Sequence, residues 1–557
     1  MNFGIVMPKY VSKGEVYEFN FGLLFISACL KQHNINVFCL NPNHYSIKID
    51  EQLSDFIVKN KIDVLCTGGM SVHCKEIIQI VETAKKTKSD IIVIVGGAII
   101  TSIPKVTLSN IRQIDYGVVG EGEETIVELA DALINKTDIF SVKGLAYFDK
   151  KNNYILTEER IPIFNLDTIP FPDYDGFEYG EYIKLNYPSK IKPVLTLLDD
   201  VRIGYTLSSR SCPFKCTFCY HYPLSKYRQR SLDNIFKEID YLVAKYNINF
   251  LSINDELFST NKERMFKFAE RIKPYNIKWY TSFRVSDVDK ESLTVLKSAG
   301  MSMINYGIES LSNKILTSMN KHTTKEQIEK AMKLTYDAKI NIQGNIILGD
   351  SEETEETVKE SVDWLKSHPE YGINLIMIRM YPSSQLYKLS IKRGLITDEF
   401  KHMKNNFPLI NLTKMNDKKY KDISIYVENF GSESQNLISG KVISSTVISK
   451  TECKENIFSV KVKCPHCSTI NEYKNMVQIK NSFITYSFVV CRECYLNLRI
   501  ENIKAYGKNY TPYDKFISFV VRKARNQVNK NQIVYFTYCA LKKLKNNNII
   551  PISNKYI

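Results

Sequence analysis

Three cysteines in one short loop constrain this 557-residue chain more than any other feature. Cys212, Cys216 and Cys219 are separated by three and then two residues, and the loop follows a predicted strand. Three thiolates can hold three corners of a four-iron, four-sulfur cluster, whereas a cluster that only carries electrons usually has four cysteine ligands. The fourth iron would then be open to a small molecule, which could receive an electron directly. The competing interpretations are three chance cysteines or part of a zinc site.

Predicted strands and helices alternate from Val201 to about Ile396. The helix at 232–245, for example, carries apolar residues at helical spacing. The predicted strands are 206–208, 250–253, 279–283, 303–308, 341–348 and 373–380. This alternation predicts a partial (β/α)6 barrel, in which catalytic groups gather at the carboxyl ends of the strands.

A second alternation of strands and helices, over residues 1–140, predicts a doubly wound parallel sheet of the Rossmann-like α/β class. Three of its strands end in glycine-containing turns, at the edge where such sheets bind ligands. The residues of these turns are Gly68, Gly69, Ser71, Gly96, Gly97, Gly120 and Glu121. Glycine lets the backbone approach a flat or phosphorylated ligand closely. A single glycine pair after a strand is more often only a turn, so the prediction of a ligand site depends on all three turns together.

Together, the cysteine loop and the glycine turns resemble the radical S-adenosylmethionine (SAM) enzymes that carry an N-terminal cobalamin-binding domain. The resemblance includes Gly-Glu-Gly-Glu-x-Thr at 120–125. It implies a cobalamin-binding domain at 1–140, a turn-rich linker at 141–200 and a radical SAM barrel at 201–396. In that family the open iron is chelated by SAM, and reductive cleavage gives a 5′-deoxyadenosyl radical that abstracts hydrogen from substrate.

The resemblance also implies which residues bind the cofactors. Cys212, Cys216 and Cys219 would hold the [4Fe-4S] cluster, and the glycine turns would bind cobalamin. The candidates for binding SAM are Glu256 for its amino group, Arg284 for a carboxylate or phosphate, Glu309 for the ribose and Gly344 for the adenine. Without the resemblance, the carboxylates at 255–256 could equally be a surface turn, and the strand with Gly344 could be any buried strand.

Two positions depart from the family. Ser211 stands where relatives usually have glycine before the first cysteine. The Asp-x-His-x-x-Gly motif, whose histidine ligates cobalt in mutase-type domains, is not matched by Asn41 to Ser46. We therefore expect cobalt to lack a lower imidazole ligand from this domain, and we expect His44 to be a surface loop residue.

The remaining residues, 397–557, are predicted to form a C-terminal domain with two CxxC pairs. The four cysteines are Cys464, Cys467, Cys491 and Cys494. Four thiolates close a tetrahedron, so we expect a structural zinc ion; an auxiliary iron–sulfur cluster is the alternative. Alternating residues at 477–490 predict a β-hairpin. The basic tail at 515–545 has aromatic residues at helical spacing, which favours a packing face over a nucleic-acid surface.

Composition excludes some classes of protein. The chain lacks a run of 18 apolar residues, so no transmembrane helix is expected, and its start lacks a signal-peptide cleavage site. Seven of its 13 cysteines have metal-type spacing, which indicates a reducing cytoplasm. The net charge is +15, and the lysines are dispersed through the chain rather than gathered in one stripe. This pattern favours a merely lysine-rich composition over a surface that binds nucleic acid.

The leading hypothesis is a radical SAM enzyme that uses cobalamin to methylate an unactivated carbon of a small-molecule or natural-product substrate. A reductase, flavodoxin or ferredoxin would supply electrons. The alternatives are a rearrangement, cyclisation or methylthiolation with a vestigial cobalamin domain. The N-terminal cysteines lack the second triplet of tRNA methylthiotransferases, so we discount that reaction. A non-enzymatic sensor or nucleic-acid-binding module would not need the three-cysteine loop.

Overall fold

The computed structural model describes residues 1–501, except for 14, 16, 18, 186, 188–191, 221–225, 434–436, 478 and 481–484. These residues divide into two units. The first contains 1–186, 201–437 and 495–497, and the second contains 187–200, 438–494 and the residues from 498.

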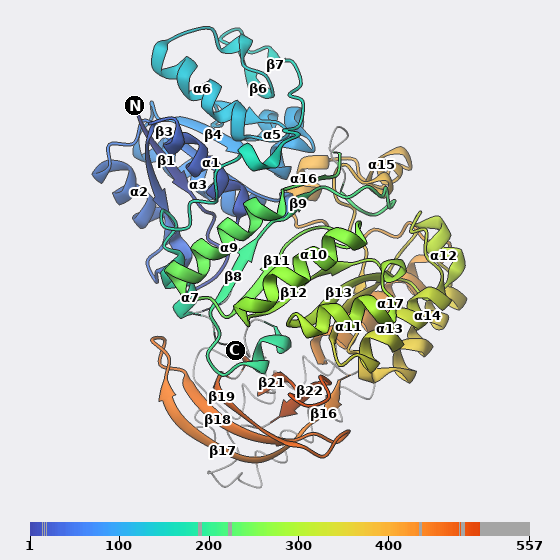
Figure 1. Ribbon diagram of the computed structural model, residues 1–557. Helices are drawn as coiled ribbons and strands as arrows, with labels where there is room; N and C mark the ends of the chain where they lie inside the picture. The colour runs from blue at the N-terminus through green and yellow to red at the C-terminus, as the bar shows by residue number, and fades with distance from the viewer. Residues whose placement is uncertain are drawn as a thin grey trace, which may run out of the picture. The chain divides into compact units, whose positions relative to one another are not determined.

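A seven-stranded sheet with helices on both faces forms the N-terminal part of the first unit (Figure 1). Its strand order is β2-β1-β3-β4-β5-β6-β7. The strands are β1 (Asn2–Val6), β2 (Asn36–Leu40), β3 (Val64–Gly68), β4 (Ile92–Gly96), β5 (Tyr116–Val118), β6 (Leu145–Phe148) and β7 (Tyr154–Leu156). The first five are parallel, which confirms the doubly wound sheet. Strands β6 and β7 continue it antiparallel, so the start of the predicted linker belongs to the sheet.

Amphipathic helices cover this sheet. They are α1 (Phe21–Gln32), α2 (Ile49–Lys59), α3 (Cys74–Thr87), α4 (Ala98–Thr101), α5 (Pro104–Asn110) and α6 (Glu123–Asn135). The sequence predicts a helix over 55–59, but α2 begins at Ile49, because Ile49, Leu53 and Ile57 recur every four residues and are buried together on one face.

Six parallel strands form the sheet of the predicted barrel, in the order β15-β14-β13-β12-β11-β8, which confirms the predicted (β/α)6 pattern. They are β8 (Ile203–Thr206), β11 (Phe250–Ile253), β12 (Lys278–Phe283), β13 (Met301–Glu309), β14 (Asn341–Leu348) and β15 (Asn374–Met377). The first strand ends at Thr206 rather than Ser208, because Ser208 turns to donate hydrogen bonds to the buried Asp255.

The helices that follow these strands begin at side-chain caps, apart from α12. They are α9 (Leu232–Tyr246), α10 (Lys262–Ile272), α11 (Lys290–Ser298), α12 (Asn313–Ser318), α13 (Lys325–Asp337), α14 (Glu355–Ser367) and α15 (Gln385–Lys392). Thr324 and Thr354 form capping boxes with residues three positions later. Such caps satisfy backbone N–H groups that the first helical turn leaves unpaired.

Tyrosines fasten the predicted linker to the first barrel strand. Tyr174 and Tyr179 are fully buried, and their hydroxyls donate to the carbonyls of Tyr205 and Ile203, each at 2.8 Å. His44 lies in the same region and is 6% exposed, with its ring 2.8 Å from the Tyr17 hydroxyl. Our expectation of a surface loop histidine is therefore wrong, because the loop folds under the linker.

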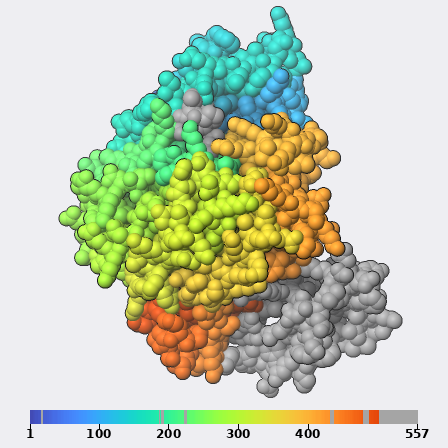
Figure 2. Space-filling view, turned by 90° about the vertical axis from the view of Figure 1, so that its right-hand side faces the viewer, coloured from blue at the N-terminus to red at the C-terminus, as the bar shows by residue number. Residues whose placement is uncertain are grey.

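Residues 397–437, which we assigned to the C-terminal domain, pack with the first unit. They form α16 (Glu399–Lys404) and α17 (Asp417–Glu433). Met403 and Phe407 are buried in the hydrophobic core of the N-terminal sheet. In the space-filling view, the gold-orange residues near 400 adjoin blue N-terminal ones (Figure 2). Burial of these apolar side chains keeps the segment on that sheet.

The second unit contains three antiparallel strand pairs and one short parallel pair among the pairings described. One sheet contains β17 (Lys441–Lys450), β18 (Asn456–Lys463) and β19 (Ile470–Val477). Another contains β16 (Ile438–Ser439), β20 (Ile479–Lys480), β21 (Thr485–Val490) and β22 (Asn497–Glu501). The antiparallel pairing of β20 with β21 confirms the predicted hairpin. The aromatic tail at 515–545 lies outside the described residues.

Candidate functional site

The cysteine loop connects β9 (Ser209–Arg210) to β10 (Arg228–Gln229) at the mouth of the barrel sheet. Hydrogen bonds hold it on both sides. The N–H of Thr217 donates to the Met319 carbonyl at 3.1 Å, and its own carbonyl accepts from the N–H of Leu386 at 3.1 Å. The Asn320 amide donates to the Lys215 carbonyl at 3.0 Å. The loop is therefore anchored to the end of α12 and to the first turn of α15, which lie in the segments that follow β13 and β15.

The backbone before the first cysteine adopts a conformation that favours glycine. Ser211 has a φ of +67°, and non-glycine residues rarely adopt positive φ. The serine is thus accommodated with backbone strain at the position where relatives usually have glycine.

The three thiols of the cysteine loop are close enough for the charge of one to raise the pKa of another. Burial, and after it the charges of Glu256, Cys216 and Cys212, raise the pKa of Cys219 to about 12. Burial also raises the pKa of Cys212 and Cys216. Three thiolates at this place therefore need a compensating positive charge, which iron ions supply. The donor set fits a cluster with three protein ligands.

Glu256 and Asp255 have separate roles at the end of β11. Asp255 is 3% exposed and accepts hydrogen bonds from the backbone N–H groups of Ser208 and Ser209, at 2.6 and 3.0 Å. Glu256 remains accessible to solvent, although crowding protein atoms raise its pKa through desolvation. Of the two carboxylates, Glu256 is the one open to a ligand.

Glu309 pairs with a lysine that the sequence did not single out. Lys321 is 7% exposed, and its Nζ lies 2.8 Å from Oε1 of Glu309. Glu309 has a φ of +66°. A Cβ at Gly307 would lie 2.4 Å from Nζ of Lys321 and 2.8 Å from Oε1 of Glu309. The Gly-Ile-Glu segment thus makes room for a buried ion pair, and Lys321 also lowers the pKa of Cys216 through its charge.

Arg284 is committed to the cysteine loop. Its guanidinium lies 3.6 Å from the centre of the Phe214 ring and donates to the carbonyls of Lys321 and His322. Beside Gly344, the space is taken by Ile308, whose Cδ1 would lie 2.6 Å from an added Cβ. This glycine therefore serves packing between β13 and β14. The roles of Glu256, Arg284, Glu309 and Gly344 in binding SAM remain predictions.

Backbone meets backbone where the glycine turns end β3 and β4. Gly68 and Gly96 are partners in the sheet register. A Cβ on Gly68 would lie 2.4 Å from the Gly96 carbonyl oxygen. A Cβ on Gly97, whose φ is +85°, would lie 2.7 Å from the Gly69 carbonyl oxygen. The glycines thus allow close packing of the backbones at this edge, which polar side chains also line beside Gly69. We call it the glycine edge, and its contact with a corrinoid stays a prediction.

The other predicted cobalamin residues lie near this edge. Ser71 is buried after β3, and the N–H of Gly120 donates to Oγ1 of Thr101 at 3.0 Å. The two carboxylate oxygens of Glu121 accept hydrogen bonds from Arg228, at 2.7 and 2.9 Å. The side chain of Glu121 is thus already paired, and its contact with cobalamin stays a prediction.

The four C-terminal cysteines are brought together. Their Sγ atoms all lie within 4.8 Å of one another, with Cys464 3.7 Å from Cys494 and Cys467 3.6 Å from Cys491. Tetrahedral zinc at about 2.3 Å from each sulfur requires sulfurs about 3.8 Å apart. A cubane cluster binds each thiolate at a different iron and needs a wider spacing. The geometry favours one metal ion over the auxiliary cluster.

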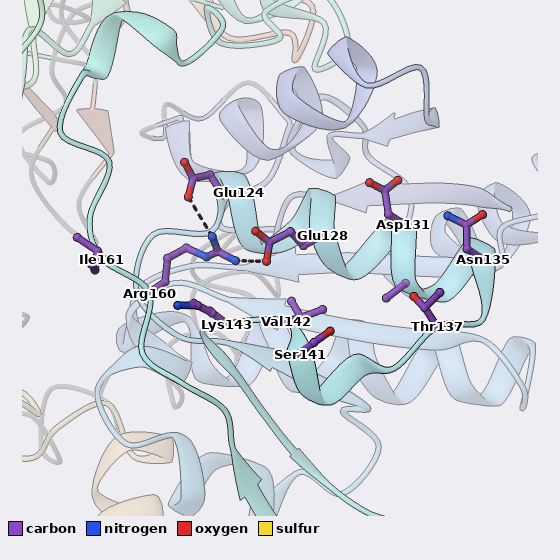
Figure 3. A pocket seen from close by; sticks show the side chains of 11 residues that line it. Glu124, Glu128, Asp131, Asn135, Thr137, Ser141, Val142, Lys143, Arg160 and Ile161 are labelled. Atoms are coloured by element: carbon purple, nitrogen blue, oxygen red, sulfur yellow. Dashed lines mark hydrogen bonds and ion pairs between the residues drawn. The ribbon is translucent and has the colours of Figure 1, made fainter.

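Two cavities lie in the first unit. One of about 580 Å³ runs along α6, where Arg160 pairs with Glu124 and Glu128 (Figure 3). The other, of about 500 Å³, is lined by Thr101 and Val119 near the glycine turns and by Ser383 and Tyr387 near the anchor of the cysteine loop. No helix in the described part of the chain is long and apolar enough to cross a membrane.

Comparison with known proteins agrees with this arrangement. Residues 206–365 match the radical SAM superfamily, and residues 9–130 match the B12 binding domain. The chain belongs to the radical SAM enzymes that carry a B12-binding domain. The cofactors of this family are a [4Fe-4S] cluster, SAM and cobalamin.

The proteins whose sequences are similar to this chain include one named as a methyltransferase and one named as a cyclase. An uncharacterized methyltransferase of Pyrococcus horikoshii is 29% identical over 322 residues, which cover 57% of this chain and 67% of that protein. An anaerobic magnesium-protoporphyrin IX monomethyl ester cyclase of Rubrivivax gelatinosus is 26% identical, over 61% of this chain and 60% of that protein. The matches thus span about two thirds or less of these relatives.

A solved structure shares the fold. The radical SAM methyltransferase TsrM from Kitasatospora setae, bound to tryptophan and a SAM analogue, superimposes with a TM-score of 0.59 and 18% identity. The match covers 71% of this chain and 77% of that structure.

Proposed function

We propose that this enzyme methylates an unactivated carbon of a small molecule, with SAM as the methyl source and cobalamin as the carrier. One observation carries the proposal. The three-cysteine loop and the glycine edge belong to the same unit, where Arg210, two residues before Cys212, binds Glu123 beside the Gly120 turn. When bound, the cluster would supply the electron that cleaves SAM, and cobalamin would carry the methyl group.

The chain's own residues would hold and orient these groups. Cys212, Cys216 and Cys219 would ligate the cluster and leave one iron open. Glu256, accessible at the end of β11, would accept a hydrogen bond from the SAM ammonium group. The buried pair of Glu309 and Lys321 would offer a carboxylate to the ribose hydroxyls. Low exposure at this pair would limit the access of water.

The cavity of about 500 Å³ is the proposed place for substrate. Its volume is in the range of small-molecule pockets. It has walls from both predicted cofactor sites, since Thr101 supports the Gly120 turn and the helix of Tyr387 anchors the cysteine loop through Leu386. A flavodoxin, ferredoxin or reductase is the proposed electron donor.

For the four C-terminal cysteines we propose a structural zinc ion. Asn471 supports this site from outside, since its amide donates to Sγ of Cys491 at 3.4 Å and its oxygen accepts from the N–H of Arg492 at 3.1 Å. Such outer contacts orient metal ligands.

The test is anaerobic reconstitution with iron, sulfide and hydroxocobalamin, followed by reduction in the presence of SAM. The wild-type protein should retain corrinoid through gel filtration and form both 5′-deoxyadenosine and S-adenosylhomocysteine. Replacement of Cys212, Cys216 or Cys219 by alanine should abolish 5′-deoxyadenosine, whereas Cys453→Ala, an exposed cysteine outside both sites, should not. Formation of 5′-deoxyadenosine by any of the three variants would overturn the cluster assignment.

A second candidate is another radical reaction with a vestigial cobalamin domain. The relative named as a cyclase favours keeping it. It predicts 5′-deoxyadenosine without S-adenosylhomocysteine and without retained corrinoid.

A further inference from the structure

Two arginines of the hairpin that carries the cysteine loop face two glutamates of the N-terminal domain. Strands β9 and β10 pair antiparallel, with Arg210 directly opposite Arg228. Like charges at directly opposite positions destabilise a pair of strands. Glu121 and Glu123 offset this repulsion with two negative charges, so contact with the N-terminal domain stabilises the hairpin. We call these four residues the interdomain ion cluster.

The contacts of the interdomain ion cluster are close and shielded. Arg228 binds Glu121 through both branches of its guanidinium, at 2.7 and 2.9 Å. Arg210 donates to Glu123 and lies 3.4 Å from Glu121. The four side chains are between 5% and 18% exposed. Burial alone would raise the pKa of Glu121, but the hydrogen bond from Arg228 and the charge of Arg210 hold it below its usual value, so the carboxylate stays charged.

The linker between the two domains is part of the same network. Arg228 donates to the carbonyl of Ile163 at 2.7 Å, and the N–H of Ile163 donates to Glu121 at 2.8 Å. One bidentate pair therefore fixes three separate segments of the chain. Bidentate arginine–carboxylate pairs set orientation as well as distance.

The position of these residues along the chain suggests their role. Glu121 follows Gly120 of the predicted cobalamin edge, and Arg210 stands two residues before Cys212. We propose that the interdomain ion cluster is a positioning device, which holds the glycine edge in register with the cysteine loop so that groups bound at the two sites can react together. This inference rests on the proposed function. Small misplacements matter, since an error of about 1 Å can cost about 100-fold in rate.

The test uses Arg228→Gln in the full-length protein, with Lys143→Gln as the matched control. Lys143 loses an exposed pair with Glu158, where the two side chains are 46% and 72% exposed. Formation of 5′-deoxyadenosine requires only the cysteine-loop site, whereas S-adenosylhomocysteine requires transfer between the sites. Arg228→Gln should lower the ratio of S-adenosylhomocysteine to 5′-deoxyadenosine by about tenfold or more, because any fall in 5′-deoxyadenosine should be much smaller than the fall in S-adenosylhomocysteine. The control should leave the ratio unchanged.

A second readout does not depend on activity. In the protein without cofactors, Arg228→Gln should speed amide hydrogen exchange in both 119–123 and 209–216, and the control should not. If Arg228→Gln does not fold, Arg210→Lys replaces it, since lysine keeps the charge and loses the planar fork; the ratio should again fall. An unchanged ratio, or an equal fall in both products, would overturn the inference. A wild-type protein that forms no S-adenosylhomocysteine would overturn the proposed function, and unchanged exchange in either loop would independently overturn the positioning role.

Discussion

Replacing Gly97 by alanine tests whether the glycine edge depends on the close approach of two backbones. Gly97 has a φ of +85° and a ψ of −169°, a region that is essentially restricted to glycine and costs other residues about 1–3 kcal/mol. The new Cβ would also lie 2.7 Å from the oxygen and 2.9 Å from the nitrogen of Gly69. Overpacking of this kind costs about 1–3 kcal/mol more. The expected loss in free energy of unfolding is therefore about 2–6 kcal/mol.

Gly394→Ala provides the matched control. Gly394 also has a positive φ, of +71°, but an added Cβ there would have no neighbour within 4 Å. It should cost only the backbone strain, about 1–2 kcal/mol. Because a multidomain chain does not unfold in one step, the measurement is amide hydrogen exchange of β3 and β4 for Gly97→Ala and of the C-terminal end of α15 for Gly394→Ala. Equal destabilisation by the two variants would refute the close-approach argument. Gly97→Ala should also weaken corrinoid retention in gel filtration.

Three further predictions concern the loop, a buried carboxyl and the metal. Ser211→Gly should raise the local opening free energy of 209–216 by about 0.5–1 kcal/mol in amide hydrogen exchange, because it removes the strain at φ +67° at some cost in chain entropy; faster exchange there would contradict this. Burial raises the pKa of Glu353 from 4.5 to about 7. The folded state thus holds this proton more tightly, and stability that is present below about pH 4.5 should be lost as the pH rises through 7, by about 3 kcal/mol. Glu353→Gln should remove that part of the pH dependence from the opening free energy of α14, measured by amide hydrogen exchange at several pH values, and parallel pH profiles would contradict the assignment. Metal analysis of a protein lacking the cluster cysteines should give about one zinc per chain, and Cys464→Ala should lose it while Cys453→Ala retains it; iron and sulfide at this site would favour an auxiliary cluster.

Local sequence patterns were enough to predict much of the fold. The six strands of the barrel sheet and the five parallel strands of the N-terminal sheet were each predicted from an apolar run followed by a helical period. Boundaries were less accurate, as at α2, where the burial of Ile49 extends the helix. The folded linker was missed, because its proline and glycine spacing resembles a connector, whereas Tyr174 and Tyr179 are stabilised by partners from other segments of the chain, among them β8 and Glu238.

The residues of the candidate site were also only partly predictable from the sequence. Sequence spacing alone indicated the cysteines, since metal ligands close together on a loop are close in space. It did not indicate Lys321, which lies beside Glu309 only because β13 and the segment after α12 fold back together. It also did not indicate that Arg228 pairs with Glu121, a contact across 107 positions of the chain.

The sequence by itself determined the fold class, the family and the identity of the seven metal-type cysteines, because each depends on short-range spacing and on the alternation of strand and helix. Only the tertiary structure decided which carboxylates remain open to a ligand and which are consumed in pairs. It also decided that the four C-terminal sulfurs lie at the spacing of a single ion. The physical reason is that charges and thiols interact through space over a few ångströms, and the chain positions that supply them are set by how distant segments pack.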